Sequence, residues 1–173
     1  MFFELIATFV AGLGAAGLVM GIVKMSRGRL PKWLTPAAAG LAMIVFTIWS
    51  EYNWYDRTTA TLPEGIEIAR VGETKQFFRP WTYAAPIRDN FVAVDLVSIR
   101  ENAADPDKRI ANIVVMKRWA MPSQVAVLFD CTGARTAPLT EGATLSPEGA
   151  VEGATWINVP ADDPVLQTAC KRG

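Results

Sequence analysis

The chain offers few of the residue types on which active sites are usually built. It contains no histidine, which excludes Ser-His-Asp and Cys-His nucleophile pairs and histidine-ligated metals. It also has no CxxC pair, no GxxxxGK[ST], no HExxH and no GxGxxG that opens a helix. We therefore expect a protein that is not an enzyme, with no catalytic residue, no metal site and no cofactor.

One carboxylate stands in an unusual place. Asp95 is the single acid within the apolar stretch Phe91–Ile99, where it could form a buried pair with Arg100 or Lys117. A catalytic carboxylate needs a second carboxylate or a base nearby, and only Asp130 is a candidate, by adjacency of strands. We expect a structural role for Asp95.

Two pairs of neighbouring acidic residues could bind a metal ion only if their carboxylates formed a cluster of ligands. They are Asp105 with Asp107 and Asp162 with Asp163. Oxygen ligands suit calcium or magnesium, but both pairs stand beside prolines, where turn and helix-cap roles explain them better.

The two cysteines, Cys131 and Cys170, both belong to the C-terminal two thirds of the chain. An oxidising compartment would pair them. Such a bond would close a loop of about 40 residues and stabilise a small domain by roughly 4 kcal/mol. The alternative is a pair of unrelated free thiols.

Two long uncharged runs predict a pair of membrane-spanning helices. The first run is Leu5–Val23 and the second is Trp33–Ser50. A helix needs about 20 apolar residues to cross a bilayer, whereas a helix of a soluble protein does not need apolar residues on every face. We expect a transmembrane hairpin over residues 1–56, with helices at about 3–24 and 33–52 and a turn at 25–32.

The distribution of charge predicts the orientation of this hairpin. Its turn and the border of the turn carry four basic residues and no acid: Lys24, Arg27, Arg29 and Lys32. The opposite flanks carry Glu4, Glu51 and Asp56. Because lysine and arginine are retained on the cytoplasmic side, we expect a bacterial inner-membrane protein with a cytoplasmic turn and both termini in the periplasm.

Aromatic residues border the second run. Tryptophan and tyrosine are enriched at the headgroup level of membranes. We expect a membrane-interface role for five of them: Trp33, Trp49, Tyr52, Trp54 and Tyr55. Stacking on a cofactor or a sugar is the alternative for this cluster.

The first run is rich in small residues, which allow helix backbones to approach closely within a bilayer. Gly17 and Gly21 form a GxxxG pair, and Gly12 with Ala16 forms a second small-residue pair. One explanation is packing of the first helix on the second. The other explanation is that a small-residue face of the first helix docks on a partner protein, because the packing of two helices on each other covers only one such face.

Residues 57–173 predict a small periplasmic β-rich domain that begins with a polar linker over 57–65. Alternating or β-branched stretches predict strands, and short connections make neighbouring strands antiparallel. The expected strands are Ile66–Val71, then a three-stranded meander of Phe91–Ile99, Ile110–Trp119 and Gln124–Asp130, and a late strand over Trp156–Val159. Basic and acidic residues are nearly balanced, so we expect no nucleic-acid partner.

A short C-terminal helix is expected after Asp163, which would be its N-cap, with Pro164 in its first turn. A turn is expected earlier, over Ser146–Gly149. The predicted fold class is therefore α+β: a two-helix transmembrane hairpin, then an antiparallel β domain whose terminal helix is tied down by a disulfide.

The segment Gln76–Pro86 combines aromatic residues, prolines and one arginine, and its prolines exclude a regular helix. Its aromatic residues could cover the sheet as core residues, which is the simpler explanation. Alternatively the segment lies on the membrane or against a partner, since exposed aromatics with arginine are typical of interface hot spots. The candidate contact residues are Phe77, Phe78, Arg79, Trp81 and Tyr83.

The C-terminal part resembles the periplasmic domains of the surface-adhesin protein E type. The resemblance is carried by Asp130–Cys131 after a strand, by Trp156, by Val159–Pro160 and by a short helix that ends in Cys170. That family usually follows a lipoprotein or secretory signal, whereas this chain has a two-helix anchor, so the resemblance implies only the disulfide and the layout. The whole chain resembles small uncharacterised two-helix membrane proteins of alphaproteobacteria, which implies a location and no mechanism.

These observations favour a membrane-anchored periplasmic protein that acts by protein contact, as an accessory or assembly subunit of a larger inner-membrane complex. Its expected partners are the lipid bilayer and a membrane protein or further copies of itself. The alternative is a periplasmic module that binds or senses a small ligand in the β domain.

Overall fold

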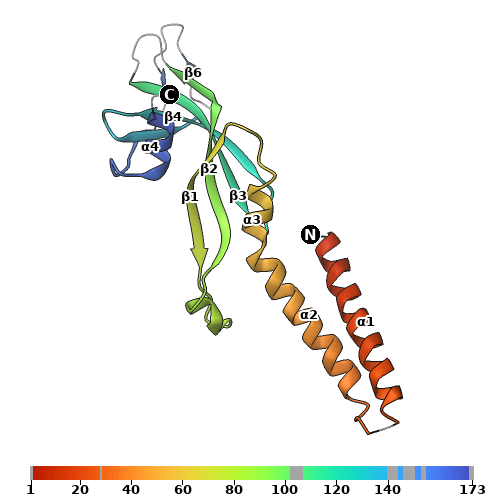
Figure 1. The fold of residues 1–173 in the computed structure, drawn as a ribbon. Coiled ribbons are helices and arrows are strands. Elements are labelled where there is room, and N and C mark those ends of the chain that lie inside the picture. The colour runs from red at the N-terminus through yellow and green to blue at the C-terminus, as the bar shows by residue number, and fades with distance from the viewer. Residues whose placement is uncertain are drawn as a thin grey trace. The chain divides into compact units, whose positions relative to one another are not determined.

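The computed structural model describes residues 2–27, 29–101, 107–139, 144–145, 151–152 and 155–171. The chain divides into two compact units, Met1–Arg57 and Thr58–Gly173 (Figure 1). The first unit ends at Arg57, whereas the sequence placed the border after residue 56.

The first unit is a helical hairpin. Its two long helices are α1 (Phe2–Met25) and α2 (Leu34–Tyr52). Both are long and apolar enough to cross a membrane, and both were expected within two residues of these bounds. The short helix α3 (Trp54–Thr59) follows α2 almost directly. The prediction of a polar linker from residue 57 was therefore wrong over its first residues, which continue a helical turn in which the Arg57 N–H bonds the Asn53 carbonyl.

The second unit is built on one antiparallel sheet of six strands. Its spatial order is β1-β2-β3-β4-β5-β8, with every neighbouring pair antiparallel. The strands are β1 (Ile66–Thr74), β2 (Ile87–Glu101), β3 (Lys108–Lys117), β4 (Ser123–Asp130), β5 (Arg135–Pro138) and β8 (Ile157–Asn158). The expected meander is confirmed as β2-β3-β4, and the predicted α+β class is confirmed.

Two further short strands, β6 (Thr144–Leu145) and β7 (Val151–Glu152), pair with each other outside this sheet. The turn expected over Ser146–Gly149 lies outside the described residues. The late strand is shorter than expected and covers only Ile157–Asn158.

The core lies between the sheet and the short helix α4 (Pro164–Cys170). Alternation along β4 turns Val127 and Phe129 to the same face of the sheet, where they meet Leu166 and Ala169 of α4. Phe129 has no exposed surface. As predicted, Asp163 caps α4, because its carboxylate accepts hydrogen bonds from the backbone N–H groups of Val165 and Leu166 at 2.9 and 3.2 Å.

The C-terminal end of α4 is fastened to the sheet. Cys170 forms the predicted disulfide with Cys131, which directly follows β4, and their Cα atoms lie 5.8 Å apart. Arg109 of β3 donates to the carbonyl oxygens of Ala169 and Lys171 at 3.4 and 3.0 Å, where a cation also suits the negative end of the helix. These contacts hold in place a helix that has only seven residues.

Candidate functional site

The hairpin uses one glycine of α1 for close contact between its helices. Gly12 is the buried residue of α1, and a Cβ atom placed there would lie 2.4 Å from the Cε atom of Met43 in α2. Packing of the first helix on the second is therefore confirmed for Gly12.

The other glycines of α1 are not used in this contact. A Cβ atom at Gly14, Gly17 or Gly21 would meet no other atom within 4 Å. These three positions follow one another by three and four residues, which places them on one face of the helix, opposite the face of Gly12. The predicted GxxxG pair thus belongs to a second face, here called the open glycine face, that the hairpin itself leaves uncovered.

A polar cluster joins the two ends of the hairpin. The Glu4 carboxylate at the start of α1 accepts a hydrogen bond from the Ser50 hydroxyl of α2 at 2.7 Å. Arg57 donates to the Ser50 hydroxyl and carbonyl oxygens at 3.1 and 3.2 Å and lies 3.5 Å from Glu4. Sequence reasoning used Glu4 only as a topological marker, and its position ahead of an apolar run was the one available signal of this role.

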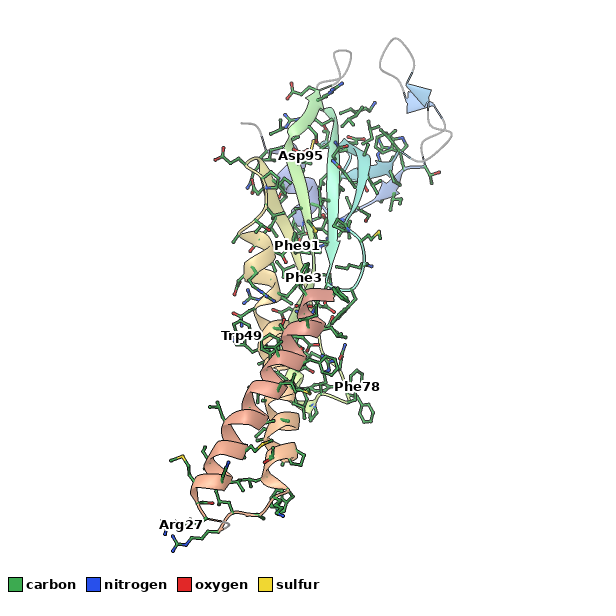
Figure 2. All side chains as sticks on the ribbon, turned by 90° about the vertical axis from the view of Figure 1, so that its right-hand side faces the viewer. Phe3, Arg27, Trp49, Phe78, Phe91 and Asp95 are labelled. Atoms are coloured by element: carbon green, nitrogen blue, oxygen red, sulfur yellow. A yellow bond between two sulfur atoms is a disulfide. The ribbon has the colours of Figure 1, made fainter. Side chains whose placement is uncertain are left out.

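The basic residues predicted to set the topology gather at the turn of the hairpin. Arg27 stands at the turn with a positive φ of 52° (Figure 2). Lys24, Arg29 and Lys32 are exposed around it. Of the aromatic residues assigned to the membrane interface, Trp33 and Trp49 are exposed, whereas Tyr52, Trp54 and Tyr55 are half-buried.

The aromatic segment between β1 and β2 is on the surface. Phe77 is 88% exposed and Phe78 67%, and Figure 2 shows Phe78 standing away from the ribbon. Trp81 and Tyr83 are exposed as well, and Arg79 lies over the Phe78 ring at 5.6 Å. The explanation that these rings cover the sheet as core residues was wrong, because Thr82 takes the buried position of the segment instead.

Asp95 has the structural role expected of it, but through different partners (Figure 2). Its carboxylate accepts hydrogen bonds from the backbone N–H groups of Val97 and Ser98 at 3.1 and 3.3 Å. The Ser98 hydroxyl in turn accepts from the Asn112 N–H at 2.8 Å. These bonds stabilise an irregularity in the pairing of β2 with β3 between Asp95 and Arg100.

Asp130 is also committed to local structure. It accepts hydrogen bonds from the Gly133 N–H at 2.7 Å and from the Arg135 guanidinium at 3.1 Å. Burial raises the pKa of the Asp130 carboxyl, but these two donors, together with the charges of Arg135 and Lys108, outweigh burial and hold that pKa below its ordinary value. The carboxylate therefore stabilises the domain at neutral pH, and this contribution is lost as the pH falls through the folded-state pKa.

One of the acidic residues considered as a metal ligand has another role. Asp163 caps α4 and forms an ion pair with Arg70 of β1. Asp105 lies outside the described residues. Across the part of the chain that the structure describes, no group of three or more His, Cys, Asp or Glu side chains is placed to hold a metal ion.

Two features of the described surface could bind a partner. They are the open glycine face on α1 and the exposed aromatic segment between β1 and β2. Their side chains are small or apolar and suit packing. Comparison with known protein families, curated proteins and solved structures gives no match to this chain.

Proposed function

We propose that this chain is a bacterial inner-membrane protein that holds its disulfide-bonded β domain in the periplasm and acts by contact with a partner protein. It would serve as an accessory or assembly subunit of a larger membrane complex. Both long helices suit a membrane, and the four basic residues at the hairpin turn favour a cytoplasmic turn.

The open glycine face is the observation that carries the proposal. Within a bilayer, helices associate through close packing and not through hydrophobic burial, and small residues permit that packing. Glycine is also unfavourable in a helix by about 1 kcal/mol relative to alanine. The helix α1 has three glycines, Gly14, Gly17 and Gly21, on a face that the hairpin does not use. A transmembrane helix of a partner protein that packs on this face explains them best.

The acidic residues of the β domain support a role in contact over a role in catalysis. Asp95 holds a backbone irregularity and Asp130 holds a turn. Both carboxylates are engaged by backbone N–H groups, and the lowered pKa of the Asp130 carboxyl makes it a poor proton donor. We therefore propose that the protein is not an enzyme.

The substitution Gly17→Leu tests the proposal. The larger side chain would project from the open glycine face and keep a partner helix at a distance, while Gly12 and the hairpin contact remain. The tagged full chain, solubilised in mild detergent, is expected to co-purify with a stoichiometric membrane protein that mass spectrometry identifies. The Gly17→Leu variant is expected to lose most of that protein.

Met20→Leu is the matched control, because it places the same side chain on α1 at an exposed position, about 60° around the helix from Gly17. It exchanges residues of similar volume and is expected to retain the partner. A chain that purifies alone, or a partner that both variants retain equally, contradicts the proposal.

A further inference from the structure

The connection between β1 and β2 and the turn between β3 and β4 lie at the same end of the sheet. Lys117 pairs with Asn90, and the Arg118 N–H donates to the Asp89 carbonyl at 2.8 Å. Residues 75–88 and 117–123 are here called the aromatic tip. Their exposed large apolar side chains are Phe77, Phe78, Trp81, Tyr83, Trp119 and Met121.

The aromatic tip is ordered in a way that keeps these side chains outside. The Thr82 hydroxyl is completely buried, accepts from the Gln76 N–H at 2.9 Å and donates to the Arg79 carbonyl at 2.7 Å. Pro80–Tyr83 form a short 3-10 helix on this support. A polar side chain is thus buried while large rings are presented to the surroundings, which is the reverse of what solubility requires.

The tip carries an excess of basic residues. Its two segments contain Lys75, Arg79, Arg88, Lys117 and Arg118, of which Arg118 is buried, and the acids Glu73 and Asp89 stand at the borders of the first segment. Two of them lie over rings of the tip, Arg79 over Phe78 and Arg118 over Trp119 at 5.0 Å. The near balance of charge over the whole domain conceals this local excess. Surfaces that combine aromatic rings with basic residues typically bind at the headgroup level of a membrane with anionic lipids.

The linker between α2 and β1 keeps the β domain close to such a membrane. Residues 53–65 join α2 to β1 and span less than about 30 Å, the length they would have if every residue outside α3 were extended, because residues 58–66 form turns. β1 has nine residues and leads to the tip over about 30 Å. The linker therefore keeps the β domain within a few tens of ångströms of the bilayer that would hold α2. Tethering at this distance gives a high effective concentration of lipid headgroups.

We propose that the aromatic tip docks on the surface of the bilayer that holds the chain's own helices. The rings insert between the headgroups, and the exposed basic residues Lys75, Arg88 and Lys117 bind anionic lipid phosphates. This inference rests on the membrane anchor of the proposed function but not on its protein partner. Docking would fix the β domain at one height above the membrane.

The test uses the full chain with a polarity-sensitive fluorophore on a single new cysteine. The native Cys131–Cys170 pair is oxidised and does not react. The label is attached through Phe77→Cys at the tip or through Val97→Cys on β2. Val97 is similarly exposed at 80% but lies nine residues beyond the end of the tip at Arg88. Both proteins are reconstituted into vesicles of phosphatidylethanolamine and phosphatidylglycerol that carry a headgroup-linked quencher.

The label at position 77 is expected to shift to the blue and to be quenched, whereas the label at position 97 stays in water. Lys75→Gln with Lys117→Gln, both exposed positions, should reduce the quenching at position 77. High salt or neutral phosphatidylcholine vesicles should reduce it as well, because both weaken attraction to anionic headgroups.

A label at position 77 that stays in water, in chains that float with the vesicles, overturns the inference. Equal quenching at both positions also overturns it, as does a label at position 77 that becomes protected only in native membranes, which would assign the tip to a protein partner. Chains that do not float with vesicles at all would instead contradict the membrane anchor of the proposed function.

Discussion

Replacement of Cys131 and Cys170 by alanine should lower the free energy of unfolding of the β domain by about 4 kcal/mol. The disulfide closes a loop with a sequence separation of 39 residues, so its loss frees the unfolded chain from a long-range constraint. In the folded domain it ties α4 to the end of β4, and α4 supplies the core residues Leu166 and Ala169. A small domain has little stability to spare for such a loss.

Urea unfolding of the full chain in mild detergent, followed by the circular dichroism of the sheet, measures this change. Reduction of the wild-type protein is the matched control, because it should give a similar loss without a substitution. The double variant should be insensitive to the reductant. An unfolding midpoint that neither treatment moves would contradict the role assigned to the disulfide.

Phe129→Ala should lower the same free energy by about 3–5 kcal/mol, since it removes a large buried side chain and leaves a cavity. Phe129 has no exposed surface and lies in the cluster that joins β4 to α4. The side chains around it, Val94 and Ala111 of the sheet and Leu166 of α4, are held by backbone pairing and the disulfide and can fill the space only in part.

The control for this substitution is Phe77→Ala, which deletes the same ring from a position that is 88% exposed. Urea unfolding should show a change within about 0.5 kcal/mol for this surface variant. Equal destabilisation by the two substitutions would mean that the core is not where the structure places it.

Sequence patterns predicted the parts of the fold that depend on strong local signals. The apolar runs predicted α1 and α2, alternation and short connections predicted the β2-β3-β4 meander, and Asp163–Pro164 predicted the start of α4. The pairing of Cys131 with Cys170 followed from their number and the expected compartment, and it is confirmed.

Features that depend on contacts between distant residues were not predictable in this way. The strands β5 and β8 are four and two residues long, too short for a period to fix their bounds, so the late strand was expected over Trp156–Val159 but covers only Ile157–Asn158. The irregularity at Asp95 depends on how β2 pairs with β3, and prolines interrupt any period in the Phe77–Tyr83 segment. Its rings could therefore be assigned to the core or to the surface equally well from sequence.

The candidate site shows the same limit. Small residues occupy more than one face of α1, so the sequence could not tell which face meets α2. The position of Met43 decides this, because it lies against Gly12 and leaves Gly17 and Gly21 open. The tip was missed as a charged surface because its two segments, residues 75–88 and 117–123, are far apart in the chain and meet only through the pairing of β2 with β3.

The proposed function depends on a membrane hairpin whose turn is cytoplasmic and whose β domain lies in an oxidising compartment. A membrane-impermeant maleimide tests it most directly, applied to spheroplasts of cells that express Ser26→Cys at the turn or Val97→Cys on the β domain. The Val97→Cys protein is predicted to react in intact spheroplasts, and the Ser26→Cys protein only after the inner membrane is broken. The opposite pattern, with the turn labelled from outside and the β domain protected, would contradict the orientation and with it the proposed function.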